Sequence, residues 1–162
     1  MTPEFVTIGA HGWEAERFFA VLVAASVDTF CDLRARRGVR GREYAFANSQ
    51  RLQARLAELG IRYLHRLDLA PSAATRSQQH AVDEATHTAK RSRAILSPAF
   101  IESYHRERLD GFDAAAFLSD LGSGARVVAL FCVEREPAAC HRSLLAERLT
   151  HDLGVKVTHL TP

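Results

Sequence analysis

Apolar residues recur along this chain in short runs that are separated by polar, glycine-containing stretches. The clearest run, 127–131, is continuous and begins with two valines, which is typical of a strand buried on both faces. Segments 5–8, 27–33, 61–64 and 155–160 have the same character and predict further strands. Between them, apolar positions at helical spacing predict helices near 18–23, 52–59, 100–109 and 117–121.

Strands that alternate with helices predict an α/β fold. We expect a single three-layer domain over residues 1–162, with a mostly parallel sheet of about five strands, helices on both faces and 127–131 at the centre. Residues 67–97 are the least regular part. Their Ser/Thr/Ala-rich front half is typical of a loop, and their rear half has room for one or two helices.

The composition of the chain narrows the class of protein. Among 162 residues, 47% are hydrophobic and 25% charged, as in soluble globular proteins. There is no apolar run of membrane-spanning length and no signal-peptide pattern, so we expect no membrane partner. Three cysteines are an odd number for a disulfide framework and suit a reducing compartment, which predicts a cytoplasmic protein. The oligomeric state is left open.

The stretch 126–153 carries the densest set of reactive side chains. Its strand is followed by a short acidic turn and by Pro137, which suits the first turn of a helix. In a parallel sheet this junction lies at the carboxyl edge, where ligands bind and free helix N–H groups attract anions. The residues concerned are Cys132, Glu134, Arg135, Glu136, Cys140, His141 and Arg142.

Each of these side chains has a structural and a functional interpretation. Glu134 suits either a helix cap or a general acid or base, and Arg142 can hold Glu134 or grip an anion. His141 suits a proton shuttle, a ligand contact or a helix-end residue. Cys132 is a candidate nucleophile, but position 138 is Ala where cysteine phosphatases need Arg, so a buried strand end is the alternative.

No recognised metal-ligand spacing is present, since Cys140 and His141 are adjacent and Cys132 lies eight positions from Cys140. Cys140 falls on the apolar stripe of its helix, which favours core packing. We therefore expect no metal site. Residues 9–12 lack the spacing of a dinucleotide fingerprint, and no cofactor is expected.

Other strand ends add polar side chains to the same edge. Asp32 and Arg34 are two apart on a strand and share a face, where they can meet a ligand or form a buried ion pair. His65 ends the third strand, and His11 lies in the turn after the first. We expect Asp32, Arg34, His65, Glu134 and Arg142 to line one crevice, with His11 and His141 as further anion contacts.

The segment after Asp32 is strongly basic, with Arg34, Arg36, Arg37, Arg40 and Arg42 within nine residues. A net charge of +2 does not by itself indicate nucleic-acid binding. A solvated basic loop is the simpler interpretation. Tyr44 and Phe46 follow closely, however, so Arg36, Arg37, Arg40 and Arg42 are candidate contacts to phosphate or single-stranded nucleic acid.

Four motifs resemble those of the DUF488 family. They are TIG at Thr7 to Gly9, the D-x-R of Asp32 and Arg34, GIRYLH at 60–65, and C-V-E-R-E-P-A-A-C-H-R from Cys132 to Arg142. The resemblance spans nearly the whole chain and implies a three-layer α/β fold with a strand-edge site, but no settled reaction. The loops after Arg34 and after His65 depart from the family's pattern, so we expect a specialised member.

Two functions remain in view. The first is an enzyme that acts on an anionic, phosphate-bearing or nucleotide-like substrate, with Asp32 or Glu134 as acid or base and Arg34 and Arg142 as clamps. The second is a non-catalytic module that binds a nucleotide or nucleic acid in the same crevice. The expected partner is thus a small anionic ligand or nucleic acid.

Overall fold

The computed structural model describes residues 1–162 and contains one five-stranded sheet. The strands are β1 (Glu4–Ile8), β2 (Thr29–Asp32), β3 (Arg62–His65), β4 (Val127–Phe131) and β5 (Val157–Leu160). They are hydrogen-bonded in the order β3-β2-β4-β1-β5, and every neighbouring pair is parallel. The predicted parallel sheet and the central place of β4 are confirmed. None of the helices combines the length and the apolarity that crossing a bilayer requires.

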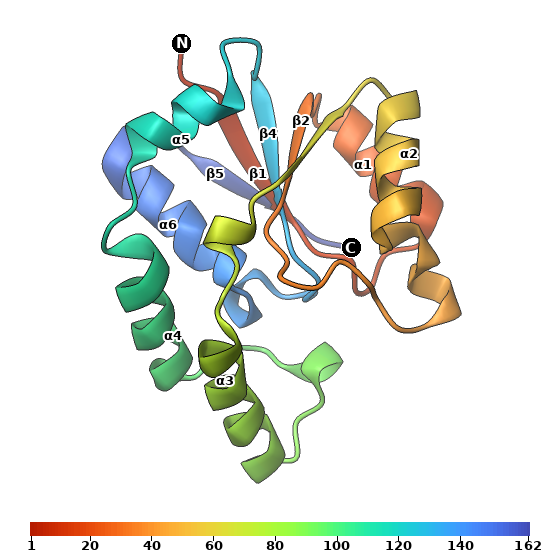
Figure 1. The fold of residues 1–162 in the computed structure, drawn as a ribbon. Coiled ribbons are helices and arrows are strands. Elements are labelled where there is room, and N and C mark those ends of the chain that lie inside the picture. Colours follow the sequence, from red (N-terminus) through yellow and green to blue (C-terminus); the bar gives the residue numbers. More distant parts are fainter.

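Helices cover both faces of the sheet (Figure 1). One face carries α1 (Ala15–Ala24) and α2 (Ser49–Glu58), and the other carries α4 (Pro98–Tyr104), α5 (Ala114–Leu121) and α6 (His141–Leu153). Along β4, Val128 and Leu130 join the core beneath α4 to α6, whereas Ala129 and Phe131 join the core beneath α1 and α2. Because both faces are covered, β4 is apolar throughout. The fold is a three-layer α/β arrangement, as predicted.

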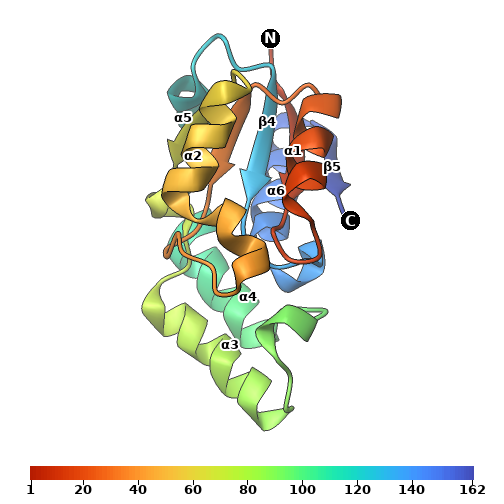
Figure 2. The ribbon, with the colours of Figure 1, turned by 90° about the vertical axis from the view of Figure 1, so that its right-hand side faces the viewer.

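The remaining helix, α3 (Ala73–Ala85), projects beyond the carboxyl ends of the strands (Figure 2). Ser72 caps it, since its hydroxyl accepts a hydrogen bond from the Thr75 N–H at 3.2 Å. The chain then passes through a 3₁₀ turn at Lys90–Ser92 before α4. The expectation for 67–97 was therefore wrong: most of α3 lies in the front half, and the rear half holds only the end of α3 and a 3₁₀ turn. The buried face of α3 is polar, so apolar periodicity did not reveal it.

The helix that was expected to open at Pro137 begins four residues later. Pro137–Ala139 form a 3₁₀ turn, Cys140 is extended with φ −138° and ψ 144°, and α6 starts at His141. Arg93 donates to the Ala139 carbonyl from Nε and Nη2, at 3.3 and 3.1 Å. Because a side chain engages this carbonyl and Cys140 is extended, the 3₁₀ turn and α6 do not merge into one helix.

Candidate functional site

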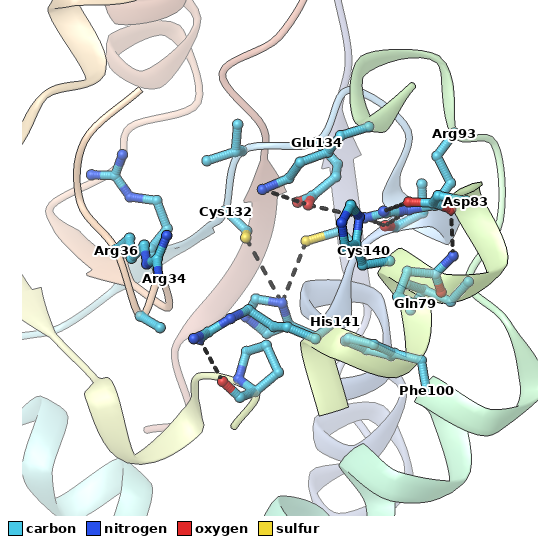
Figure 3. A pocket seen from close by; sticks show the side chains of 18 of the residues that line it. Arg34, Arg36, Gln79, Asp83, Arg93, Phe100, Cys132, Glu134, Cys140 and His141 are labelled. Atoms are coloured by element: carbon cyan, nitrogen blue, oxygen red, sulfur yellow. Dashed lines mark hydrogen bonds and ion pairs between the residues drawn. The ribbon is translucent and has the colours of Figure 1, made fainter. Parts of the chain in front are cut away.

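A pocket opens at the carboxyl edge of the sheet, between the segments that follow β2 and β4 and the projecting α3 (Figure 3). Its volume of about 420 Å³ is within the range of small-molecule sites. We call it the edge pocket. Its polar and sulfur-containing lining residues are Arg34, Arg36, Arg76, Ser77, Gln79, His80, Asp83, Lys90, Arg93, Cys132, Glu134, Cys140 and His141.

Two thiols and an imidazole converge on one wall of the edge pocket. The sulfur atoms of Cys132 and Cys140 each lie 3.8 Å from Nδ1 of His141, and all three residues are buried. Nε2 of His141 lies 3.0 Å from the Leu33 carbonyl. Because a carbonyl only accepts hydrogen bonds, Nε2 carries the hydrogen in the neutral ring, and Nδ1 turns its lone pair toward the sulfurs.

The two thiols differ in their electrostatics. Burial would raise the pKa of Cys140, but the neighbouring Cys132 thiol and the positive charges of His141 and Arg142 bring it below its usual range. The neighbouring Cys140 sulfur, together with burial, raises the pKa of Cys132. Burial would lower the pKa of His141, but the Cys140 sulfur raises it. Cys140 therefore ionises before Cys132, the residue singled out from the sequence as a candidate nucleophile.

Glu134 is a buried carboxylate with one engaged oxygen and one free oxygen. Its Oε1 accepts a hydrogen bond from Arg93 Nη2 at 3.1 Å and lies 3.6 Å from the Lys90 ammonium. Oε2 is buried and has no hydrogen-bond partner. Burial would raise the pKa of Glu134, but Lys90 and Arg93 hold it far below its usual range. The side chain is thus an anion whose second oxygen is available.

Arg142 holds the main chain that carries Glu134. Its Nη1 donates to the Glu134 carbonyl at 2.7 Å, and its Nη2 donates to the Arg135 carbonyl at 3.1 Å. Arg142 is completely buried and does not line the edge pocket. Arg142 therefore positions the loop. It neither binds the Glu134 carboxylate nor reaches the pocket to bind an anion, which are the two roles expected from the sequence.

Asp32 and Arg34 form the buried ion pair that was one of their two interpretations. Asp32 Oδ1 accepts from the Arg34 backbone N–H and Nε, and Oδ2 accepts from Arg34 Nη2 and the Tyr63 hydroxyl. Arg34 Nη1 donates to the Ala47 carbonyl at 2.9 Å. Both oxygens of Asp32 are therefore occupied. Arg34 reaches the pocket wall with its guanidinium already engaged.

The single crevice expected for five residues is only partly formed. Arg34 and Glu134 do line the edge pocket, but Asp32, His65 and Arg142 lie behind its wall. His65 supports the loop after β2, because its Nε2 lies 2.8 Å from the Arg34 carbonyl. The physical reason is that these three side chains turn to partners within the protein: Asp32 to Arg34 and Tyr63, His65 to the Arg34 carbonyl, and Arg142 to the main chain at Glu134.

His11 also lies outside the edge pocket. Its ring packs against Tyr44 with centroids 5.0 Å apart, and its Nδ1 is buried without a partner. Tyr44 in turn lies under the Arg91 guanidinium, 5.0 Å from the ring centroid. Phe46 is buried in the core against Phe18. It therefore cannot stack on a nucleic-acid base, although its place close to the basic loop suggested that role.

Of the basic loop, only Arg36 joins Arg34 in lining the edge pocket. Arg37 donates to the Tyr63 hydroxyl at 3.4 Å. Arg40 and Arg42 are exposed, and Arg42 lines a separate hollow beside α1 and α2. The loop therefore presents its charge to solvent over a wide area rather than to one point.

Several pocket residues come from 73–97, where the sequence pattern predicts no site. Arg93 bridges Asp83 at 2.7 Å and Glu134 at 3.1 Å, and Gln79 donates to Asp83 at 2.8 Å. The available signal was a polar repeat: Thr75, Gln79 and Asp83 recur every fourth residue and are all buried. A repeat of four is typical of one face of a helix, but here the repeated residues are polar, so a search for apolar stripes does not find it.

Cys132, Cys140 and His141 are the residues that could hold a metal ion, since their donor atoms lie within 4.8 Å of one another. Sequence spacing had argued against such a site. The fold brings the donors together because Cys132 directly follows β4 and Cys140 is extended before α6. Spacing rules describe ligands on one local motif, whereas this cluster spans a strand end and a helix start.

The parallel sheet and the edge pocket define the class of protein: an α/β protein with a site at the carboxyl edge of its sheet that contains cysteine and histidine side chains. The chain belongs to the DUF488 family: the model described as "Domain of unknown function DUF488" matches residues 14–149, which confirms the expected membership. No curated protein and no solved structure matches the chain.

Proposed function

We propose that the protein is an enzyme that binds a small anionic substrate, phosphate-bearing or nucleotide-like, in the edge pocket and acts on it through the ionised Glu134 as a general base. Of the two acid–base residues predicted from the sequence, Glu134 retains a free carboxylate oxygen, whereas both oxygens of Asp32 accept hydrogen bonds within the protein.

The charge of the pocket lining supports an anionic substrate. Five basic residues and two acidic ones line the pocket: Arg34, Arg36, Arg76, Lys90 and Arg93 against Asp83 and Glu134. Because Asp32 balances the charge of Arg34, the formal excess is two positive charges. Arg36 is exposed, and Arg76 uses only Nη1, which donates to the Pro71 carbonyl at 3.0 Å. These two guanidinium groups are therefore the best placed to bind a phosphate or carboxylate of the substrate.

The observation that carries the proposal is the unpartnered Oε2 of Glu134. A buried carboxylate with a purely structural role normally has both oxygens hydrogen-bonded, because an unmet buried acceptor costs about 1–3 kcal/mol. Here Arg93, Lys90 and the Arg142-held main chain fix the group while Oε2 stays free. Such an arrangement suits a group that meets a substrate or a bound water.

Incubation with a cell metabolite extract, read by mass spectrometry, tests the proposal. The wild-type protein should deplete an anionic metabolite and accumulate a product, and Glu134→Gln should slow this by about 100-fold or more, as expected for loss of an acid–base group. Glu136→Gln, an exposed carboxylate two residues away, is the matched control and should retain activity. An extract left unchanged by the wild type, or equal turnover by both variants, would contradict the enzyme.

The second candidate, a non-catalytic nucleotide or nucleic-acid-binding module, is favoured by the exposed Arg36, Arg40 and Arg42. Replacing Arg36, Arg37, Arg40 and Arg42 together with Ala should weaken nucleic-acid binding and flatten its dependence on salt, because fewer counterions are released. Filter binding at several salt concentrations measures both effects. Undetectable or salt-insensitive binding by the wild type would remove this candidate.

We also propose a cytoplasmic location. All three cysteines are free thiols, and Cys132 and Cys140 face each other across His141 without a disulfide. A reducing compartment keeps such a pair available for chemistry.

A further inference from the structure

We propose that Cys132, Cys140 and His141 form a three-ligand zinc site whose fourth coordination position opens into the edge pocket. The inference rests on the proposed function only in taking the edge pocket as the place where substrate binds. Metal binding itself is measured without substrate, so the two proposals can fail separately.

The distances between the donors suit a shared ion. A tetrahedral zinc with Zn–S of about 2.3 Å and Zn–N of about 2.0–2.1 Å separates sulfur from nitrogen by about 3.6 Å. Both sulfurs lie 3.8 Å from Nδ1 of His141, and the three donor atoms all lie within 4.8 Å of one another. Since two sulfurs on one zinc are about 3.8 Å apart, the donors reach zinc geometry by moving less than about 1 Å. The two equal distances show that the ring nitrogen is shared evenly by the two sulfurs, which is the arrangement that three ligands of one ion require.

The orientation of His141 is fixed by a group outside the ligand set. Its Nε2 donates to the carbonyl of Leu33, the residue after β2, and this leaves Nδ1 free to bind. Histidines that bind metals almost always donate their other ring N–H in this way. The two thiolates that zinc would create neutralise its charge, so the complex adds no net charge to a buried site.

The number of donors favours a catalytic zinc over a structural one. Structural sites are closed by four protein ligands, whereas catalytic sites keep a position for water or substrate, and two cysteines with one histidine are a known catalytic set. The cluster contains three donors, all of them on the wall of the edge pocket. Glu134 stands outside the cluster, and its unpartnered Oε2 can accept a hydrogen bond from a water bound at the open position.

Metal titration of the full-length chain tests the site. Protein purified under reducing conditions and dialysed against a chelator is titrated with Zn²⁺ in competition with a chromophoric chelator, and with Co²⁺ followed by absorption. We expect one ion per chain, and a cobalt spectrum with a thiolate charge-transfer band. Cys132→Ser, Cys140→Ser and His141→Gln should each weaken Zn²⁺ binding by more than about 100-fold, since loss of an outer-shell partner alone costs 10–100-fold.

Cys31→Ala is the matched control, because Cys31 is also buried but lies on β2 outside the cluster. It should leave stoichiometry and affinity unchanged. Circular dichroism shows whether each variant is folded, and X-ray absorption at the zinc edge of the wild type needs no variant at all: it should show two sulfur neighbours. Failure to bind Zn²⁺, a coordination shell without sulfur, or binding that survives both cysteine substitutions would overturn the site. Any of these outcomes would leave Glu134-dependent turnover to be judged by its own experiment.

Discussion

Gly9, the residue after β1, lies against the loop that carries Glu134. A Cβ at this position would collide with the Glu134 carbonyl and would lie 3.3 Å from Arg142 Nη1. A side chain there would push the loop off the guanidinium that holds it, so the glycine is required by the close approach of two backbones.

Gly9→Ala should therefore lower the free energy of unfolding by about 1–3 kcal/mol, as overpacking does. Gly124→Ala is the control, because nothing lies within 4 Å of a Cβ at Gly124, and its cost should stay within about 0.5 kcal/mol. Urea unfolding of both variants measures the difference. Equal stability of the two would show that the loop yields freely.

His11 makes the fold sensitive to acid. Burial first, and then the positive charges of Arg91 and Lys90, lower the pKa of His11 from 6.5 to about 4, although Glu134 and Glu43 oppose this. The unfolded chain binds a proton near pH 6.5, and the folded chain does not bind it until about pH 4. Unfolding therefore takes up a proton in this window, so stability is present above pH 6.5 and falls as the pH falls toward 4.

His11→Gln should remove this proton uptake. The free energy of unfolding of His11→Gln minus that of the wild type should rise as the pH is lowered from about 6.5 to about 4. The slope of this difference against pH should correspond to at most about one proton. Urea unfolding across that range gives the slope. A stability difference that does not change with pH would contradict the low pKa.

At the level of single residues, sequence position predicted which side chains reach the carboxyl edge of the sheet. It did not predict which of them keep an atom free of hydrogen bonds within the protein. Cys132, Glu134 and His141 line the edge pocket as their place after β4 predicted. Asp32 follows the same rule, yet Arg34 and Tyr63 consume its oxygens. The donors that bind the Asp32 carboxylate include the Tyr63 hydroxyl, which comes from a segment distant in sequence, so a local sequence pattern does not predict them all.

Among the elements, α3 was missed for a reason that can be named. Helix prediction relied on apolar stripes, whereas the buried face of α3 is made of Thr75, Gln79 and Asp83. Its docking is polar: Thr75 bonds Ser103 at 2.8 Å, and Gln79 Oε1 accepts from the Ser97 backbone N–H at 2.8 Å. The strands were predicted well because each of their apolar runs packs against a helix layer.

Arg93 connects this polar helix to the site loop. Arg93→Met should cost about 3 kcal/mol of stability, because it removes the guanidinium that the largely buried Asp83 and Glu134 carboxylates share and leaves them only Gln79 and Lys90. Amide hydrogen exchange should accelerate in α3 more than in β4, since α3 loses its link to the sheet.

The matching control is Arg106→Met. Arg106 pairs with Glu102 on the surface, where the side chains are 65% and 79% exposed, so its loss should cost less than about 1 kcal/mol. Uniform acceleration of exchange across the molecule after Arg93→Met would argue against a local role for this bridge.

For the whole molecule, alternation of strands and helices was enough to predict the parallel sheet and the edge on which the site forms. It was not enough to predict that α3 and the segment to Arg93 would close that edge into a pocket. This enclosure joins residues from 34 to 141, and it depends on packing that no local window contains. The same enclosure creates the excess of positive charge on which the functional proposal depends.

The central claim is that the edge pocket binds a small anion, and calorimetric titration with inorganic pyrophosphate tests it most directly. We expect one site per chain, weaker binding at higher salt, and about tenfold weaker binding after Arg36→Ala or Arg76→Ala, since loss of a charge-assisted hydrogen bond costs about 1.4 kcal/mol or more. Arg126→Ala should bind as the wild type does, because Arg126 is 85% exposed and precedes β4 at the opposite edge. Absent binding, or binding that Arg36→Ala and Arg76→Ala leave unchanged, would contradict the claim.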